Sequence, residues 1–326
     1  MSNSKNTGKL NINNRSIVRS KKTNMEIVPI QYVFKRKFER QEQIKKVKYH
    51  AAGYCVHVGK LSPGCYSCFV PDPHRKNFVF GSRCDANCVY CTSRKKEKDL
   101  TRTQIQQIKY NVLRESTSVV FSPSSISFSG GGEPLLYLDI IDEFMVFYRG
   151  LEKYMSKKPW YYLYTNGILA TNDVLLRLKD LGFDEIRFHL GASNFSNHVY
   201  AKMKKAVRYF KAITVETPAW PLHRKKLFEM LPIIKDIGIK HLNLGEIEIN
   251  IFNYDRIASA LPDGKVYHAF EMHLYDGGLT YDIIEEIIKK KYSYSVLDCS
   301  CFVKMMQRGH AKNIRHCDVT GLCVEY

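Results

Sequence analysis

Three closely spaced cysteines, Cys84, Cys88 and Cys91, constrain this chain more than any other feature of its sequence. Thiolates at this spacing can hold three corners of a cubic 4Fe-4S cluster from one tight loop. The fourth iron then has no protein ligand, so a substrate group can bind to it directly. The spacing therefore predicts a cluster that binds a ligand rather than one that only passes electrons.

A zinc site is the alternative for the same three cysteines, because zinc knuckles tolerate similar spacing. The compartment bears on this choice. The N-terminus lacks the apolar segment of a secretory signal, and no apolar run approaches the roughly 20 residues that cross a bilayer. We therefore expect a cytoplasmic protein with no membrane partner, whose ten cysteines are metal ligands or redox groups rather than disulfides.

Positive charge is concentrated at the N-terminus. The formal net charge is +18, and residues 1–50 hold 13 Lys and Arg against 3 Glu. Such an arm can bind nucleic acid, a membrane surface or an acidic partner such as a peptide. Few stacking aromatic residues lie among the basic ones, so a solvated tail is an equal alternative. We expect disorder over residues 1–24 and a short strand and helix over 29–48.

From residue 77 onward, apolar strands alternate with helical lengths, which predicts repeated βα units around a parallel sheet. The expected strands are 78–80, 125–129, 160–164, 185–190, 212–217 and 241–249, and the expected helices are 101–115, 138–155 and, later, 280–291. Thr101 is the expected cap of the first helix. The cysteine loop follows the first strand, at the end where βα folds place their chemistry.

A glycine run, residues 130–132, follows the second expected strand and leads into Glu133 and Pro134. Glycines at a strand end let the backbone approach a ligand closely. The carboxylate of Glu133 can accept hydrogen bonds from an ammonium group. A tight turn would explain glycines alone, but their place directly after a strand favours a binding site.

The cysteine spacing, with the aromatic Tyr90 before the last cysteine and Gly-Gly-Glu-Pro after the second strand, resembles the radical S-adenosylmethionine (radical SAM) enzymes. The resemblance implies a partial (β/α)6 barrel. It implies that S-adenosylmethionine, cleaved at the cluster with an electron from an external flavodoxin or ferredoxin, gives a 5'-deoxyadenosyl radical that abstracts hydrogen from a substrate. The catalytic residues would be Cys84, Cys88 and Cys91.

The resemblance also implies a cofactor site. The glycine segment would bind the methionine amino group, and polar residues at later strand ends would hold ribose and adenine. The expected cofactor-binding residues are Tyr90, Gly131, Gly132, Glu133, Pro134, Asn166, Ser193, Glu216 and Asn243.

Segments such as VETPAWP and LNLGEIEIN narrow the resemblance, over roughly residues 50–250, to an uncharacterised group related to pyruvate formate-lyase activating enzyme. That group implies no particular substrate. The chain departs from true glycyl-radical activating enzymes in the long, cysteine-containing segment before the cluster loop. Activation of a partner protein is therefore a secondary alternative.

Seven further cysteines flank the barrel. Two intervening residues let both sulfurs of Cys65 and Cys68 face one metal, and Cys55 offers a third ligand, with His74 or the tail supplying a fourth. The ligand-rich tail holds Cys299, Cys301, Cys317 and Cys323. We expect an auxiliary iron-sulfur cluster or other metal, either within the tail or shared with the first group. Buried free thiols are the alternative.

The expected organisation is a basic arm (1–50), a cysteine-containing segment (51–76), a radical SAM barrel (77–250) and a C-terminal extension (251–326). The leading hypothesis is a radical SAM enzyme acting on a peptide, with a small metabolite as the alternative substrate. An RNA-modifying radical enzyme would use the basic arm as its handle. A non-catalytic zinc module would leave the glycine run unexplained.

Overall fold

The computed structural model describes residues 10–12, 15–17, 25–50, 55–69, 75–93, 99–116, 123–269 and 271–300 of the chain. Side chains are described from residue 25 on, except those of 50 and 67–69. Four expected metal ligands, His74, Cys301, Cys317 and Cys323, lie outside the described residues, as does the side chain of Cys68.

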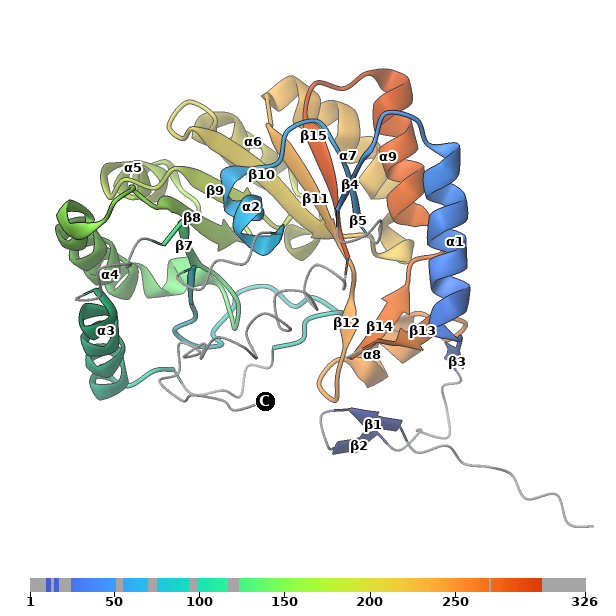
Figure 1. The fold of residues 1–326 in the computed structure, drawn as a ribbon, viewed down its shortest axis with the longest axis horizontal. Helices are drawn as coiled ribbons and strands as arrows, with labels where there is room; N and C mark the ends of the chain where they lie inside the picture. The colour runs from blue at the N-terminus through green and yellow to red at the C-terminus, as the bar shows by residue number, and fades with distance from the viewer. Residues whose placement is uncertain are drawn as a thin grey trace, which may run out of the picture.

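A sheet of nine strands organises the described part of the chain, in the order β4-β5-β15-β11-β10-β9-β8-β7-β6 (Figure 1). Seven neighbouring strands are parallel: β6 (Lys76–Phe78), β7 (Ser125–Phe128), β8 (Trp160–Thr165), β9 (Glu185–Phe188), β10 (Ala212–Pro218), β11 (His241–Gly245) and β15 (Ser295–Cys299). Antiparallel strands β5 (Cys55–Val58) and β4 (Lys48–His50) extend it beyond β15. The sheet does not close on itself, which confirms the expected α/β partial barrel.

Helices cover the outer face of this sheet (Figure 1). They are α3 (Arg102–Ser116), α4 (Leu138–Leu151), α5 (Asn172–Asp180), α6 (Asn197–Ala206), α7 (Arg224–Ile237) and α9 (Leu279–Lys290), with short 3-10 turns η2 (Pro134–Tyr137), η3 (Glu152–Tyr154), η4 (Leu190–Ser193) and η5 (Pro221–His223). The hydroxyl of Thr101 caps α3 by accepting from the backbone N–H of Gln104 at 3.3 Å. The apolar spacing of α3 is confirmed, because its buried residues are Ile105, Ile108 and Val112.

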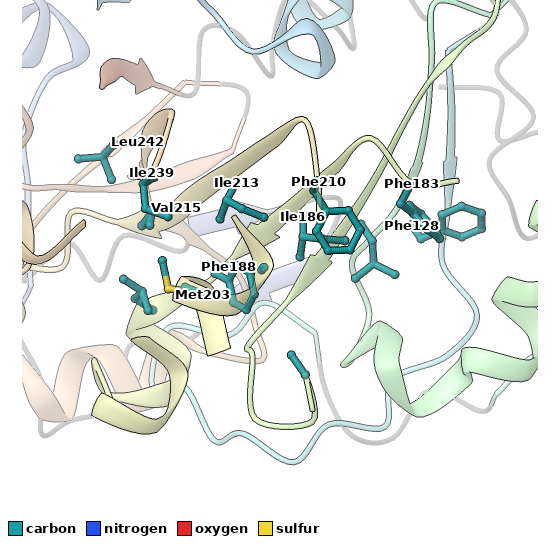
Figure 2. Close-up of a cluster of buried hydrophobic side chains, with 14 of the residues drawn as sticks. Phe128, Phe183, Ile186, Phe188, Met203, Phe210, Ile213, Val215, Ile239 and Leu242 are labelled. Atoms are coloured by element: carbon teal, nitrogen blue, oxygen red, sulfur yellow. The ribbon is translucent and has the colours of Figure 1, made fainter. Parts of the chain in front are cut away.

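The two faces of the sheet differ in chemistry, because side chains alternate along each strand. Outward residues such as Phe188 and Val215 form the main apolar core with Met203 of α6 (Figure 2). The residues that alternate with the outward ones along β9, β10 and β11 are polar and face inward. They are Glu185, Arg187, Thr214, Glu216 and Asn243. Buried polar groups need partners, and the pairing of these inward groups shapes the site described below. The short helix α2 (Pro63–Phe69) packs against this inner face.

The first expected strand, 78–80, is displaced in the structure. β6 ends at Phe78, whose carbonyl still accepts from the backbone N–H of Ser129 at 3.0 Å. The carbonyl of Phe80 instead accepts from Leu100 at 2.9 Å. The chain therefore leaves the sheet before the cysteine loop begins.

The last expected strand, 241–249, divides between two sheets. β11 ends at Gly245, and β12 (Glu248–Ile249) joins a small sheet of order β12-β14-β13-β3. Its other strands are β14 (Met272–Tyr275), β13 (Lys265–His268) and β3 (Glu26–Ile27), with α8 (Tyr254–Ala260) beside them. Ile247 and Ile249 leave the main core and pack with Tyr254 in a second apolar cluster.

Part of the basic arm is folded onto the body of the protein. Helix α1 (Ile30–Gln43) presents Lys37, which is buried in an ion pair with Glu246, and Arg40, which pairs with Asp282 at 2.7 Å. Lys37 is thereby removed from any basic surface for RNA, and the charge of the partly exposed Arg40 is paired. Farther upstream, β1 (Leu10–Ile12) and β2 (Arg15–Ile17) pair antiparallel. Among the described helices, none combines the length and apolarity needed to cross a bilayer.

Candidate active site

A cavity of about 660 Å³ lies at the carboxyl ends of the parallel strands. Its walls come from the loop after β6, the glycine run after β7 and the ends of β8, β9, β10 and β11. Parallel βα folds bind their ligands at this edge. Most of the residues predicted from the sequence line it: Cys84, Cys88, Tyr90, Cys91, Gly131, Gly132, Glu133, Pro134, Asn166 and Glu216.

Cys84, Cys88 and Cys91, which we name the loop cysteines, are partly exposed and lie on a segment without helix or strand. Burial raises the pKa of Cys88 to about 12, and the neighbouring thiols add to the rise. Burial also raises the pKa of Cys84. Both thiols are therefore protonated at pH 7, and binding a cluster would release their protons.

The arrangement of the loop cysteines bears on which metal they fit. Within the described residues, no three Cys, His, Asp or Glu side chains form a ready site for a single metal ion. A cubic cluster is larger than an ion, so it holds its thiolates farther apart. Three thiols around an open cavity fit such a cluster.

The glycine run lies directly on the backbone that precedes the loop cysteines. Gly131 has φ +62, and a Cβ there would collide with the carbonyl oxygen of Gly81. A Cβ on Gly132 would collide with the carbonyl oxygen of Arg83, which accepts from the backbone N–H of Glu133 at 2.8 Å. The glycines therefore allow their segment to pack closely against the backbone of residues 81–83, in addition to lining the cavity.

Glu133 is buried where this glycine run meets the end of β8. Its carboxylate accepts from the hydroxyl of Thr165 at 2.7 Å and from the backbone N–H groups of Asn166 at 2.8 Å and Leu135 at 3.1 Å. Burial raises the pKa of Glu133 to about 7, against these hydrogen bonds. The side chain of Asn166 donates to Asp85 at 2.5 Å, which ties this wall to the cysteine loop. Glu133 and Asn166, both predicted from the sequence to bind the cofactor, are thus in direct contact in the structure.

An aromatic wall faces the cavity from the other side. The ring of Tyr90 lies parallel to that of His189, with centroids 5.9 Å apart, and contacts Trp220 at 5.8 Å. Burial lowers the pKa of His189 to about 4, so its imidazole is neutral at pH 7. The hydroxyls of Tyr90 and Thr217 are buried and have no hydrogen-bond partner among the described residues. Two orphaned hydroxyls beside a cavity fit a polar ligand group.

Glu216 lines the cavity, whereas Asn243 lies beneath it. Asn243 pairs with Glu216 across β10 and β11 and donates to its carboxylate at 2.9 Å. Buried Arg187 donates to the same carboxylate at 3.2 Å and lies over the ring of Tyr162 at 4.3 Å. Asn243 therefore positions Glu216. Ser193 is also outside the cavity lining, and its hydroxyl donates to the carbonyl of Leu190 at 3.1 Å.

A second group of thiols, Cys55, Cys65 and Cys299, lies inside the barrel, and we name it the interior cysteines. They pack with Leu61 and Leu297. The thiol of Cys55 donates to the carbonyl of Asp298 at 2.8 Å, and burial raises its pKa well above the usual range. The sulfur of Cys65 accepts from Arg187 and Asn243, both at 3.4 Å. The structure thus brings cysteines from before and after the barrel segment together.

Among the cavity-lining residues that sequence reasoning missed are Thr217, Glu248 and Arg256. Thr217 directly follows the predicted Glu216, so its position at the strand end was a usable signal. Arg256 had no local signal, because it belongs to a helix beyond the βα rhythm. Its side chain nevertheless reaches the backbone of the cysteine loop.

Comparisons with known proteins bear on this site. The model of the Radical SAM superfamily matches residues 78–240. The uncharacterized protein MJ0804 of Methanocaldococcus jannaschii is 30% identical over 140 residues, which are 43% of this chain and 41% of that protein. The chain thus matches less than half the length of this relative.

Solved structures resemble the fold. SuiB of Streptococcus suis bound to precursor peptide SuiA has a TM-score of 0.50 and 12% identity, over 70% of this chain and 49% of SuiB. The enzyme anSMEcpe with bound AdoMet has a TM-score of 0.42 and 17% identity, over 52% of this chain and 50% of that one. At such identities, the likeness to SuiB speaks for the fold alone.

Proposed function

This chain belongs to the radical SAM superfamily, and from that premise we propose that the loop cysteines hold a 4Fe-4S cluster and that S-adenosylmethionine binds beside it in the cavity. When bound, the cluster supplies the electron that cleaves S-adenosylmethionine and so provides a 5'-deoxyadenosyl radical for hydrogen abstraction from a substrate. The electron would come from an external flavodoxin or ferredoxin.

One observation carries this proposal. The three loop cysteines, the glycine run and Glu133 line a single cavity at the carboxyl ends of the strands. The carboxylate of Glu133 would accept hydrogen bonds from the ammonium group of the cofactor, with Asn166 beside it. The unpartnered hydroxyls of Tyr90 and Thr217 would serve polar atoms of the nucleoside. Glu216, held by two donors, would stay fixed when the cavity fills.

We propose a peptide as the substrate and a small metabolite as the alternative. The SuiB structure, whose fold this chain resembles, contains a precursor peptide. The burial of Lys37 within the fold weakens the RNA-modifying alternative without removing it. Activation of a partner protein remains a secondary alternative. We place the enzyme in the cytoplasm, where its thiols would stay reduced.

The test uses anaerobically reconstituted protein with S-adenosylmethionine and dithionite, and measures 5'-deoxyadenosine as the product. Three probes are then added separately: a library of unmodified synthetic peptides, bulk transfer RNA and a panel of small metabolites. We expect the peptide library to increase 5'-deoxyadenosine formation and to acquire a mass change. Stimulation by transfer RNA alone would overturn the peptide proposal and leave the cluster proposal standing.

We also propose that the interior cysteines contribute to an auxiliary iron-sulfur cluster, in the arrangement shared between both cysteine segments. Their packing into one group favours this over a site confined to the tail. Cys68, Cys301, Cys317 and Cys323 are the candidates for further ligands.

Iron and sulfide content tests the auxiliary cluster. We expect about eight irons in the wild type and about four in the triple variant of the interior cysteines to Ala. About four irons in the wild type, all lost when the loop cysteines are replaced, would contradict the auxiliary cluster.

We propose the domain organisation in the same terms. Residues 77–250 would form the catalytic barrel, with a basic arm (1–50), a cysteine-containing segment (51–76) and a C-terminal extension (251–326) around it. The flanking segments supply β4, β5 and β15 to the barrel sheet. We therefore expect truncation at residue 76 or 250 to destabilise the barrel, which a thermal melt of each truncated chain would measure.

A further inference from the structure

The cysteine loop is held by a side chain from a distant part of the chain. Arg256 of α8 donates to the backbone carbonyl of Cys88 at 2.8 Å and to that of Cys91 at 2.9 Å. A third bond, to the carbonyl of Phe252 at 3.2 Å, ties the guanidinium to the turn that precedes its helix. The planar fork of arginine suits this task, because it places several donors in fixed directions.

Two asparagines shortly before Arg256 in the sequence also donate to backbone carbonyls of the cysteine loop. Asn253 is fully buried and donates to the carbonyl of Tyr90 at 3.0 Å. Asn250 donates to the carbonyl of Thr92 at 3.0 Å. The loop forms no helix or strand of its own, so these side chains supply the partners that regular structure would otherwise provide.

Apolar packing supports the hydrogen bonds. Tyr90 is buried in one cluster with Trp220, Ile247, Ile249 and Tyr254, and Cys88 and Val89 pack against that cluster. The small sheet and α8 thus form a platform on which the cysteine loop lies.

Arg256 also brings charge to the site. It is the one Lys or Arg among the described residues that line the cavity. A cluster on three thiolates gains negative charge when it is reduced, and a nearby cation favours the reduced form.

We propose that Arg256 is a positioning residue that fixes the cysteine loop for the cluster and raises the cluster's reduction potential. Asn250 and Asn253 share the positioning but carry no charge. The potential part of this inference rests on the proposed cluster at the loop cysteines, whereas the positioning part can be tested on protein without a cluster.

The positioning is tested by hydrogen–deuterium exchange of cluster-free protein. We expect Arg256→Gln to speed exchange several-fold in peptides covering residues 84–93. Arg256→Lys should do the same, because one ammonium group cannot hold both carbonyls with the geometry of the fork. Arg208→Gln removes the same charge from an exposed position outside the cavity and serves as the control. Unchanged exchange in both Arg256 variants would overturn the positioning role.

The potential is tested by a redox titration of reconstituted protein, followed by electron paramagnetic resonance. We expect Arg256→Gln to make reduction at least tenfold less favourable, a shift of about 59 mV for one electron. Arg256→Lys keeps the charge and should stay closer to the wild type, as should Arg208→Gln. Equal potentials in Arg256→Gln and the wild type would overturn the charge role.

These outcomes separate the inference from the proposed function. A wild type that takes up no cluster would contradict the proposed function, and the exchange experiment would still decide the positioning. If Arg256→Gln does not fold, as judged by circular dichroism, Arg256→Lys carries the exchange test. Faster exchange with an unchanged potential would keep the positioning and discard the charge.

Discussion

The loop cysteines and the interior cysteines place the same side chain in opposite surroundings. The loop cysteines come from one short segment, are partly exposed and line a cavity. The interior cysteines come from β5, α2 and β15, and two of them, Cys55 and Cys65, are 0% and 3% exposed. Their thiol and sulfur atoms already have partners in Asp298, Arg187 and Asn243. The comparison shows that the fold places one group of thiols at an open cavity and the other in a packed interior, where hydrogen bonds would have to be given up before a metal could bind.

The largest effect should come from replacing all three loop cysteines by Ala. We expect no measurable cleavage of S-adenosylmethionine, because the cluster would lose every protein ligand. The matched control is Cys55→Ala in the interior group, which should retain cleavage. Liquid chromatography of 5'-deoxyadenosine checks both. Cleavage that survives in the triple variant would place the cluster elsewhere and reverse the comparison.

Access to the thiols should differ by a large factor in cluster-free, reduced protein. We expect Cys84 to react with iodoacetamide roughly 100-fold faster than Cys55, because a buried thiol must await local opening of the fold. Peptide mapping by mass spectrometry at increasing times measures both rates. Equal rates would mean that the interior cysteines are exposed in solution, contrary to the packing seen here.

The cavity should also respond to pH through Glu133, whose pKa is raised to about 7 by burial. We expect S-adenosylmethionine affinity to rise about fivefold between pH 6 and pH 7, because only the carboxylate attracts an ammonium group. Equilibrium dialysis under anaerobic conditions measures it. In Glu133→Gln this dependence should flatten, and a wild-type affinity independent of pH would contradict the role of Glu133.

The same shift predicts the direction of a stability change. The folded pKa of Glu133 lies above its ordinary value near 4.5. Protonation of Glu133 therefore stabilises the folded state. This stabilisation is fully present below about pH 4.5 and is lost as the pH rises through about 7. Urea unfolding of the wild type and of Glu133→Gln at pH 5 and pH 8 would show a smaller pH dependence in the variant. An equal dependence would place the titration on another group.

The smallest effects should be the changes in stability caused by single cysteine substitutions, beginning with Cys55→Ala. We expect a loss of about 1 kcal/mol in the free energy of unfolding, because the substitution removes one buried sulfur and leaves a small cavity. Urea unfolding of metal-free protein measures it. Because the loop cysteines are partly exposed, Cys91→Ala should cost less under the same conditions. A larger loss in Cys91→Ala would show that the loop contributes more to the fold than the interior.

The βα rhythm and the apolar spacing of α3 could be read from the sequence, because periodic burial is a local pattern. The grouping of the loop cysteines with Glu133 and Asn166 was also predicted, since strand ends in parallel sheets share one edge. The division of 241–249 between two sheets could not be predicted. It depends on the packing of Ile247 and Ile249 against residues far away in the chain.

By itself, the sequence determined the cysteine loop, the glycine run and the parallel strands, because each rests on spacing within a few residues. Only the tertiary structure decided which polar residues reach the cavity. Asn243 and Ser193 turn to partners within the protein, whereas Arg256 crosses from α8 to the cysteine loop. Side chains from distant segments meet only when the sheet has folded, and burial then requires each polar group to find a partner.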